Sequence, residues 1–270
     1  MGGGPQYHSL VYGVDLVNVT IRGGGTLDGN GPVWWQWYNF PPGYNNRNAT
    51  NPASAALDQG GRGHTLQLVG IRGLVIQDIT LRRSPSWTFR LTFSSDVLLE
   101  RLHVRTRDPM YCPKGAAHCF QPCNEDGVDI EGCSDVIVRD SDVYSHDDAI
   151  VLKSGRTPHA CNRPTRRVLI ENCTLTTLQA AIALGSETSG GIHDVVVRNV
   201  RVALPGFHGA ASPPDAHTQQ AINIKSERTR GDAAVENLLV DGLSAGNVAT
   251  SSSKSRWSTT PVSHRSHGHS

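Results

Sequence analysis

Short apolar segments recur along this chain with a shared pattern, and this repetition limits the folds that it can adopt. Each copy has apolar residues at its first, third and last positions and mostly polar residues at its fourth and fifth. The copies are LVIQDITL (74–81), VLLERLHV (97–104), VIVRDSDV (136–143), VLIENCTL (168–175), VVVRNVRV (195–202) and LLVDGLSA (238–245), and LVNVTI (16–21) fits the front of the template. Their starts lie 23 to 43 residues apart, the irregular period of a solenoid with variable loops.

A second set of segments lies between these copies: GVDI (127–130), AIVL (149–152), AIAL (181–184) and AINI (221–224). Each alternates a small or variable residue with a large aliphatic one, as a strand with one buried face does. Two strands per repeat, frequent glycine turns and no helical periodicity predict an all-β fold, a parallel β-helix. A β-sandwich is the alternative, but it needs no register between repeats. We expect the large residues to stack inward: Val128, Ile130, Ile150, Leu152, Ile182, Leu184, Ile222 and Ile224.

Length, composition and net charge limit the number of domains and the kinds of partner that can be expected for this chain. The chain has 270 residues, 37% of them hydrophobic, and a formal charge of +1, which suits one large domain with an ordinary core. A nearly neutral chain without a concentrated basic face is not expected to bind nucleic acid or a membrane surface. No apolar run reaches the ~18 residues that span a bilayer. We expect a monomer without cofactor.

The two ends of the chain lead to separate expectations. The start, MGGGPQYHSL, lacks the layout of a secretory signal. Six cysteines and glycosylation sequons at Asn18, Asn48 and Asn172 nevertheless suit a secreted or cell-wall protein, so we expect that the true N-terminus is missing. Residues 1–249 are predicted to form the β-helix domain, and the Ser- and His-rich stretch 250–270 a disordered tail. The histidines of this tail lack Cys or carboxylate support, so no metal site is expected.

The cysteines allow two interpretations. Cys112, Cys119 and Cys123 could staple a loop with Cys133 as partner, or they could bind zinc, although their spacings match no standard zinc site. Disulfides are favoured, with Cys161 and Cys173 as a separate pair.

Carboxylates concentrate in residues 124–155, which hold seven aspartates and two glutamates. Aligning Gly127 with Ala149 places Asp126 over Asp148, and neighbouring strands lie ~4.8 Å apart. Asp147 directly precedes Asp148. Mutual repulsion should raise the pKa of at least one of the three and leave another ionised. An acid beside a carboxylate base is what glycosidic hydrolysis needs. Lone aspartates also begin turns, but this does not explain three in register.

These residues carry a resemblance. NEDGVDIEGC (124–133) and SHDDAIVLKSG (145–155) resemble motifs of the polygalacturonase family, glycoside hydrolase family 28, and GGGTLDGNGPVWW (23–35), SPSWTF (84–89) and IALGSETSGGIHDV (182–195) look like further family segments. The resemblance implies a right-handed parallel β-helix and inverting hydrolysis of galacturonan-type, pectic polysaccharides. It implies that Asp147 protonates the leaving oxygen, that Asp126 and Asp148 activate the attacking water, and that Asn124 helps to hold the site.

The chain departs from the family pattern at two positions. Ala180 stands where the family has a histidine, and Asn223 replaces the arginine of the Arg-Ile-Lys motif, while Lys225 keeps its place. Asparagine cannot reproduce the bidentate fork with which arginine holds a substrate carboxylate. Lys225, in one column with Lys153 and Glu131, is then the expected main cation for an acidic sugar, with Asn223 beside it.

Two further functions remain open from the sequence. Asn223 and terminal coils that are short or missing, as in a β-helix truncated at both ends, also fit a weak or inactive descendant that only binds polysaccharide. A pectate-lyase-like enzyme would need calcium and an arginine base, which these repeats do not present.

Overall fold

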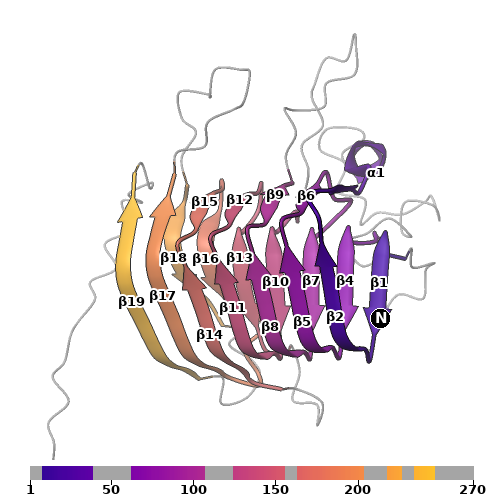
Figure 1. Cartoon of the computed structure of the whole chain (residues 1–270). Coiled ribbons are helices and arrows are strands. Elements are labelled where there is room, and N and C mark those ends of the chain that lie inside the picture. Colours follow the sequence, from indigo (N-terminus) through magenta and orange to yellow (C-terminus); the bar gives the residue numbers. More distant parts are fainter. Residues whose placement is uncertain are drawn as a thin grey trace, which may run out of the picture.

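The chain folds into a stack of coils in which every strand pairs in parallel with the equivalent strand of the next coil (Figure 1). The computed structural model describes residues 8–38, 62–106, 124–155, 163–203, 218–226 and 234–246. The predicted parallel β-helix is confirmed. Asn48, the tail 250–270 and the cysteines at 112, 119, 123 and 161 lie outside the described residues. No described helix is long and apolar enough to cross a membrane.

The first sheet has seven strands, one from each coil. They are β1 (Val11–Val14), β4 (Leu66–Val69), β7 (Phe89–Thr92), β10 (Val128–Glu131), β13 (Ile150–Lys153), β16 (Ala180–Leu184) and β18 (Gln220–Ile224).

The second sheet has twelve strands in two stacks. One stack contains β2 (Val17–Arg22), β5 (Arg72–Gln77), β8 (Ser95–Glu100), β11 (Ser134–Arg139), β14 (Thr165–Glu171), β17 (Ile192–Val202) and β19 (Val235–Ala245). The other contains β3 (Thr26–Asp28), β6 (Thr80–Arg82), β9 (His103–Arg105), β12 (Asp142–Tyr144) and β15 (Thr174–Thr176). The stacks join because β17 pairs with both β14 and β15.

A coil therefore has up to three strands, not the two predicted, because the eight-residue template contains a corner at its fifth position. The residues there have a positive φ, a backbone conformation that Asn, Asp and Gly tolerate best. They are Asp78, Arg101, Asp140, Asn172, Asn199 and Gly242. Arg101 is the exception in type, and its guanidinium donates two hydrogen bonds to the Asp78 carboxylate of the preceding coil.

The predicted register between the full copies is confirmed. Leu74 pairs with Val97, and the pairing continues through Val136, Val168, Val195 and Leu238. The early copy LVNVTI was aligned wrongly, because Val19 and not Leu16 pairs with Leu74. Leu16 precedes β2 and is exposed, so the apolar residue that suggested the alignment belongs to the turn before the strand.

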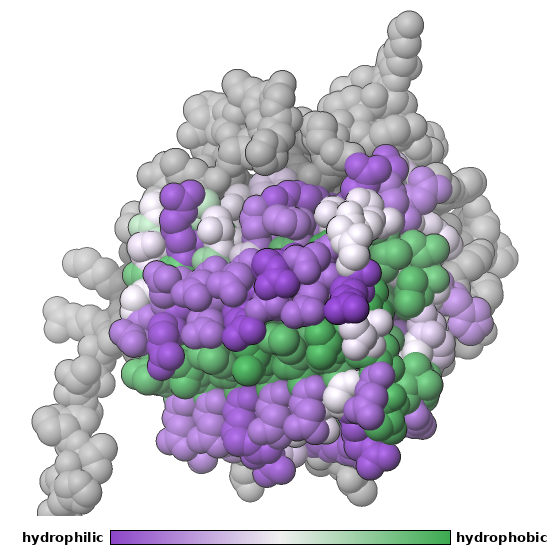
Figure 2. Space-filling model, viewed as in Figure 1, coloured by the Kyte–Doolittle hydropathy of each residue, from purple (hydrophilic) through white to green (hydrophobic). Residues whose placement is uncertain are grey.

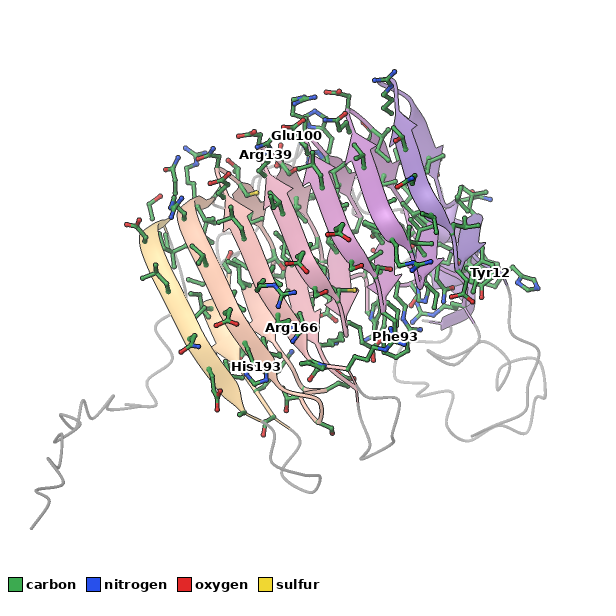
Figure 3. All side chains as sticks on the ribbon, turned by 60° about the horizontal axis from the view of Figure 1, so that its bottom comes forward. Tyr12, Phe93, Glu100, Arg139, Arg166 and His193 are labelled. Carbon is green, nitrogen blue, oxygen red and sulfur yellow. The ribbon has the colours of Figure 1, made fainter. Side chains whose placement is uncertain are left out.

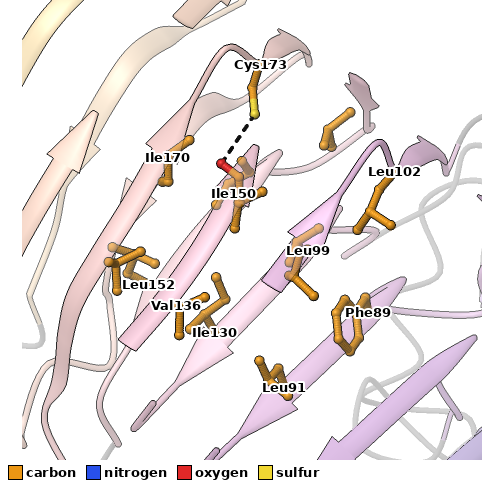
Figure 4. Packing of buried hydrophobic residues seen from close by; sticks show 14 of the residues in the cluster. Phe89, Leu91, Leu99, Leu102, Ile130, Val136, Ile150, Leu152, Ile170 and Cys173 are labelled. Atoms are coloured by element: carbon orange, nitrogen blue, oxygen red, sulfur yellow. Dashed lines mark hydrogen bonds between the residues drawn. The ribbon is translucent and has the colours of Figure 1, made fainter. Parts of the chain in front are cut away.

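The core consists of aliphatic ladders in which equivalent residues of successive coils stack (Figure 4). Of the eight residues predicted to point inward, those on β10, β13 and β16 are fully buried. Ile222 is partly buried, and Ile224 is 46% exposed. Both keep the predicted register, but β18 is the last strand of its sheet and no described strand covers its far side.

Truncating the centre of a ladder should destabilise the whole stack. We expect Ile130→Ala to lower the free energy of unfolding by about 2–5 kcal/mol, because it leaves a cavity between two flanking coils. Urea unfolding followed by far-UV circular dichroism measures the change, with Ile224→Ala at the exposed end as the matched control. Equal losses for the two variants would contradict this account of the core.

Two cysteines correct the disulfide prediction. Cys133 and Cys173 are free thiols buried in the core, and Cys173 Sγ lies 3.8 Å from the Val138 carbonyl oxygen (Figure 4). Neither staples a loop, because each follows a corner of its coil and directs its sulfur inward. Burial raises the pKa of the Cys173 thiol to about 11, so the thiol is neutral at physiological pH.

The outer face of the second sheet carries an apolar band between two polar ones (Figure 2). A groove of about 860 Å³ follows this band, and its lining includes the outward residues Val75, Leu98, Ile137, Leu169 and Val196. Charged side chains stack beside this band, and ion pairs connect them from one coil to the next. Glu100 and Arg139, for example, meet at 2.6 Å (Figure 3).

One helix, α1 (Gly31–Tyr38), interrupts the strands, although no helical periodicity was visible in the sequence. The indole of Trp35 anchors it: the ring is buried, and its Nε1 donates to the Ser84 carbonyl oxygen over 2.9 Å. A helix of eight residues is too short to show a clear period, which explains the miss.

Candidate active site

The predicted carboxylates lie in the corners that lead into neighbouring strands of the first sheet. Asp126 precedes β10, and Asp147 and Asp148 precede β13. Gly127 lets the two coils approach, because a Cβ atom there would lie 2.4 Å from the Ala149 carbonyl oxygen. The Gly127 amide donates to the Asp148 carbonyl oxygen over 2.9 Å, which places Asp126 beside Asp148 as predicted.

The turn at Asp147 is held by several hydrogen bonds. Asp147 Oδ1 accepts the Asp148 amide at 2.9 Å. The hydroxyls of Ser145 and Thr177 both donate to the Asp147 carbonyl oxygen. The backbone that carries both carboxylates is thus fixed from its own coil and from the next one.

Asp148 has a partner for each carboxylate oxygen. The Ala180 amide donates to Oδ1 at 2.9 Å, and Lys225 Nζ donates to Oδ2 at 2.8 Å. Lys225 therefore reaches the carboxylates, as the column of Glu131, Lys153 and Lys225 predicted. Only 5% of the Asp148 side chain is exposed.

The carboxylates interact strongly enough to shift one another's pKa. Burial raises the pKa of Asp126 well above its usual value, and the charges of Asp129, Asp147 and Asp148 add to the effect. Burial also raises the pKa of Asp129, to about 7, against the opposing charges of Lys153 and Arg90. We call Asp126, Asp129, Asp147 and Asp148 the carboxylate cluster. Asp126 and Asp129 therefore hold their protons above the pH at which free aspartates lose theirs.

The pKa of Asp147 is raised as well. Its main cause is burial, and the charge of Asp148 adds to it. The Asp148 amide, Lys225 and Lys153 act in the opposite direction. In such a pair, the acid with the raised pKa can protonate a leaving group. The ion-paired carboxylate beside it can activate a water molecule.

Lys153 links the cluster to the preceding coils. Its ammonium lies 3.0 Å from Glu187 and 3.8 Å from Asp129, and 4.9 Å from the centre of the Trp87 ring. Burial opposes the ammonium charge, but Asp129, Asp126 and Glu187 together raise its pKa. The guanidinium of Arg90 also lies over the Trp87 ring.

Trp87 also stacks with His64, and the centres of the two rings lie 5.6 Å apart. Burial and the charge of Arg90 lower the pKa of His64 to about 4, so this imidazole is neutral at physiological pH.

The remaining predicted residues take different positions. Asn223 lies on β18 in register with Ala183, on the strand face that also carries Asp129. Asn124 lies in the turn before β10 with a φ of 56°, and the described residues show no hydrogen bond from it to the carboxylates. No group of three or more His, Cys, Asp or Glu side chains among the described residues is arranged to hold a metal ion.

Sequence reasoning missed Asp129, Glu187 and Trp87 as members of the site, and it took Lys153 only as a column mate of Lys225. Asp129 carried a signal, since it occupies an outward position of β10 where β13 and β16 have Val151 and Ala183. A carboxylate at this outward position, beside Arg90 of the preceding coil and close to the Asp126 corner, marks a shared site. Glu187 carries no such signal because it lies outside the strands.

Comparisons with known proteins agree on one family. The profile described as "Glycosyl hydrolases family 28" matches residues 4–210. A "Probable polygalacturonase" of Vitis vinifera is 28% identical over 242 residues, which are 88% of this chain and 41% of that protein. A "Probable exopolygalacturonase X" of Aspergillus terreus is 29% identical over 86% of this chain and 46% of its own length.

Solved structures show the same fold. An exopolygalacturonase from Thermotoga maritima superposes with a TM-score of 0.60 at 21% identity, over 82% of this chain and 50% of that one. An endo-xylogalacturonan hydrolase from Aspergillus tubingensis has a TM-score of 0.58 at 14% identity, over 90% and 66% of the two chains. These matches confirm the right-handed parallel β-helix. The chain spans less than half the length of the two curated relatives that are described above.

Proposed function

Since this chain belongs to glycosyl hydrolase family 28, we propose that it hydrolyses glycosidic bonds in pectic, galacturonan-type polysaccharides. The observation that carries the proposal is the carboxylate cluster, in which Asp147, a partly buried acid with a raised pKa, lies beside a carboxylate paired with Lys225. The names of the relatives support the same substrate class.

The proposed reaction is a single inverting displacement. Asp147 gives its proton to the glycosidic oxygen as the bond to the anomeric carbon breaks. Asp148, together with Asp126, takes a proton from the water that attacks the opposite face of the sugar. Because Asp126 shares the cluster's protons with its neighbours, the resting proton belongs to the coupled group and not to one residue.

Substrate binding is assigned to the residues around the cluster. Asn223 on β18 extends the site beyond the carboxylates, on the side where Lys225 pairs with Asp148, and Asn124 borders the site at the β10 corner. A polymer that crosses the strands along the helix axis would meet Trp87 and Arg90 on one side of the carboxylates and Asn223 on the other. Pectin is a wall polymer, so we infer a secreted or cell-wall location and a protein that acts as a monomer.

A panel of pectic polymers tests the reaction class. We expect reducing ends to accumulate without absorbance from unsaturated products, and the first product observed by NMR to have the inverted anomeric configuration. Asp147→Asn prepared in the same way should lose most of this activity, which excludes a contaminating enzyme.

Other results would point to other functions. Unsaturated products would indicate a lyase. Binding of pectic oligomers without any cleavage would support the binding-only alternative, which Asn223 in place of an arginine favours.

A further inference from the structure

Lys225 reaches Asp148 across an intervening strand. Lys225 directly follows β18, whereas Asp148 precedes β13, and β16 lies between the two in the first sheet. Two strand spacings amount to roughly 10 Å. With Nζ 2.8 Å from Asp148 Oδ2, the lysine side chain must extend over the coil that contains β16.

The residues of that coil are small where the lysine crosses. Ala180 and Ala183 are fully buried and form a small apolar cluster with Val151, apart from the main core. At Gly185 a Cβ atom would lie 1.8 Å from the Lys225 carbonyl oxygen, so no larger residue fits beneath Lys225. A bulky side chain at Ala180, whose amide already contacts Asp148, would occupy the space between the two charges.

The positive charge of Lys225 is therefore already paired with the carboxylate of Asp148. Three cationic side chains extend from the described strands of the first sheet or directly after them, and each has a carboxylate partner. The pairs are Arg90 with Glu131 at 3.1 Å, Lys153 with Glu187 at 3.0 Å, and Lys225 with Asp148 at 2.8 Å. Beyond β13, the described outward column continues with Ala183 and Asn223, which carry no charge.

We propose that Lys225 is a positioning residue that orients Asp148, and that the described residues of β16 and β18 recognise a sugar unit without an unpaired cation for its carboxyl group. This role of Lys225 in catalysis assumes that the chain hydrolyses pectic polysaccharides, as proposed above. The preferred pectic chain carries a methyl-esterified or neutral unit on the β18 side of the cleaved bond. Asn223, a neutral hydrogen-bonding residue, suits such a unit better than it suits a carboxylate.

The positioning role of Lys225 can be tested by an experiment that does not depend on enzymatic activity. Lys225→Met keeps the apolar stem and removes the ammonium, and Lys225→Arg keeps the charge. Aspartate labelled with ¹³C at the carboxyl carbon reports the titration of Asp147, which faces Asp126, Asp148, Lys153 and Lys225. Because Lys225 lowers the pKa of Asp147, Lys225→Met should raise it and Lys225→Arg should restore it. An unchanged Asp147 titration in Lys225→Met would overturn the positioning role.

The substrate class is tested by kinetics on free and methyl-esterified oligogalacturonides. Lys225→Met should lower kcat about tenfold or more on both while KM stays within about threefold. The alkaline limb of its pH profile should move upward. Asn223→Arg should lower KM for the free acid only, and the exposed Arg201→Met on β17 serves as the control with unchanged kinetics.

The opposite division of the effects between kcat and KM would contradict the proposal. If Lys225→Met raised KM for the free acid alone and left kcat intact, Lys225 would bind the substrate carboxylate directly. If the wild type cleaved neither substrate, the proposed hydrolysis would fail, and the carboxyl titration would still decide whether Lys225 acts on the cluster.

Discussion

Replacing Asp147 with asparagine should lower turnover on pectic substrates by roughly 10²–10⁴-fold, the usual contribution of general acid catalysis. Asparagine keeps the shape of the side chain but has no proton to give to the leaving oxygen. The Asp148 amide can still donate to the oxygen at position 147, so the turn should persist. Reducing-end assays measure the loss, and Asp96→Asn on the exposed corner of β8 is the matched control.

The pH dependence of the wild type gives a second readout of the same group. The acid acts while protonated, so activity should fall as the pH rises through the raised pKa of Asp147. A wild type that is active and an Asp147→Asn variant that keeps full turnover would together remove Asp147 from the mechanism.

Lys153→Met should cause the largest loss of stability among the polar substitutions, about 3–5 kcal/mol. Only 8% of the Lys153 side chain is exposed, and its removal leaves the fully buried Asp129 with only the weaker influence of Arg90. Urea unfolding at pH 8 measures the change. Arg72→Met, at the exposed start of β5, should stay within about 0.5 kcal/mol of the wild type.

The stability loss should depend on pH in a defined direction. Burial raises the pKa of Asp129 to about 7 in the folded protein, so at pH 5 this carboxyl is largely protonated and needs no cation. At pH 8 it is ionised and depends on Lys153. The variant should therefore lose less stability at pH 5 than at pH 8. Equal losses at both values would show that Lys153 acts through packing alone.

Much of the fold could be predicted because the inward residues of a β-helix repeat their chemistry. Val128, Ile150 and Ile182 are all large and aliphatic, and each is flanked by small or polar residues, so the columns align without a structure. The corner at Asp78 was missed although the alternation breaks there, because Gln77 and Asp78 are consecutive outward residues between the buried Ile76 and Ile79. The apolar residue at Leu16 misled the alignment because a turn can also hold a leucine.

The site was predictable where the carboxylates follow the register, and less so where long side chains decide the contacts. The position of Asp126 beside Asp148 depends on backbone pairing alone. That Lys225 crosses a whole coil to reach Asp148 depends on the small residues beneath it and on a lysine's length, and the sequence pattern shows neither. The thiol of Cys133 faces the core because this cysteine follows a corner of its coil. The spacing of the cysteines in the sequence could not show this.

Connection lengths differ sharply among the corners of the coil. Where the second and third strands are separate, the corner between them has two or three residues in every coil. The connections that lead into the first sheet vary from 3 residues before β16 to 37 before β4. Asp126, Asp147 and Asp148 all belong to these variable connections. Insertions and deletions can therefore accumulate next to the chemistry while the stacked core stays unchanged, so a change of substrate can evolve in this scaffold by altering loop length alone.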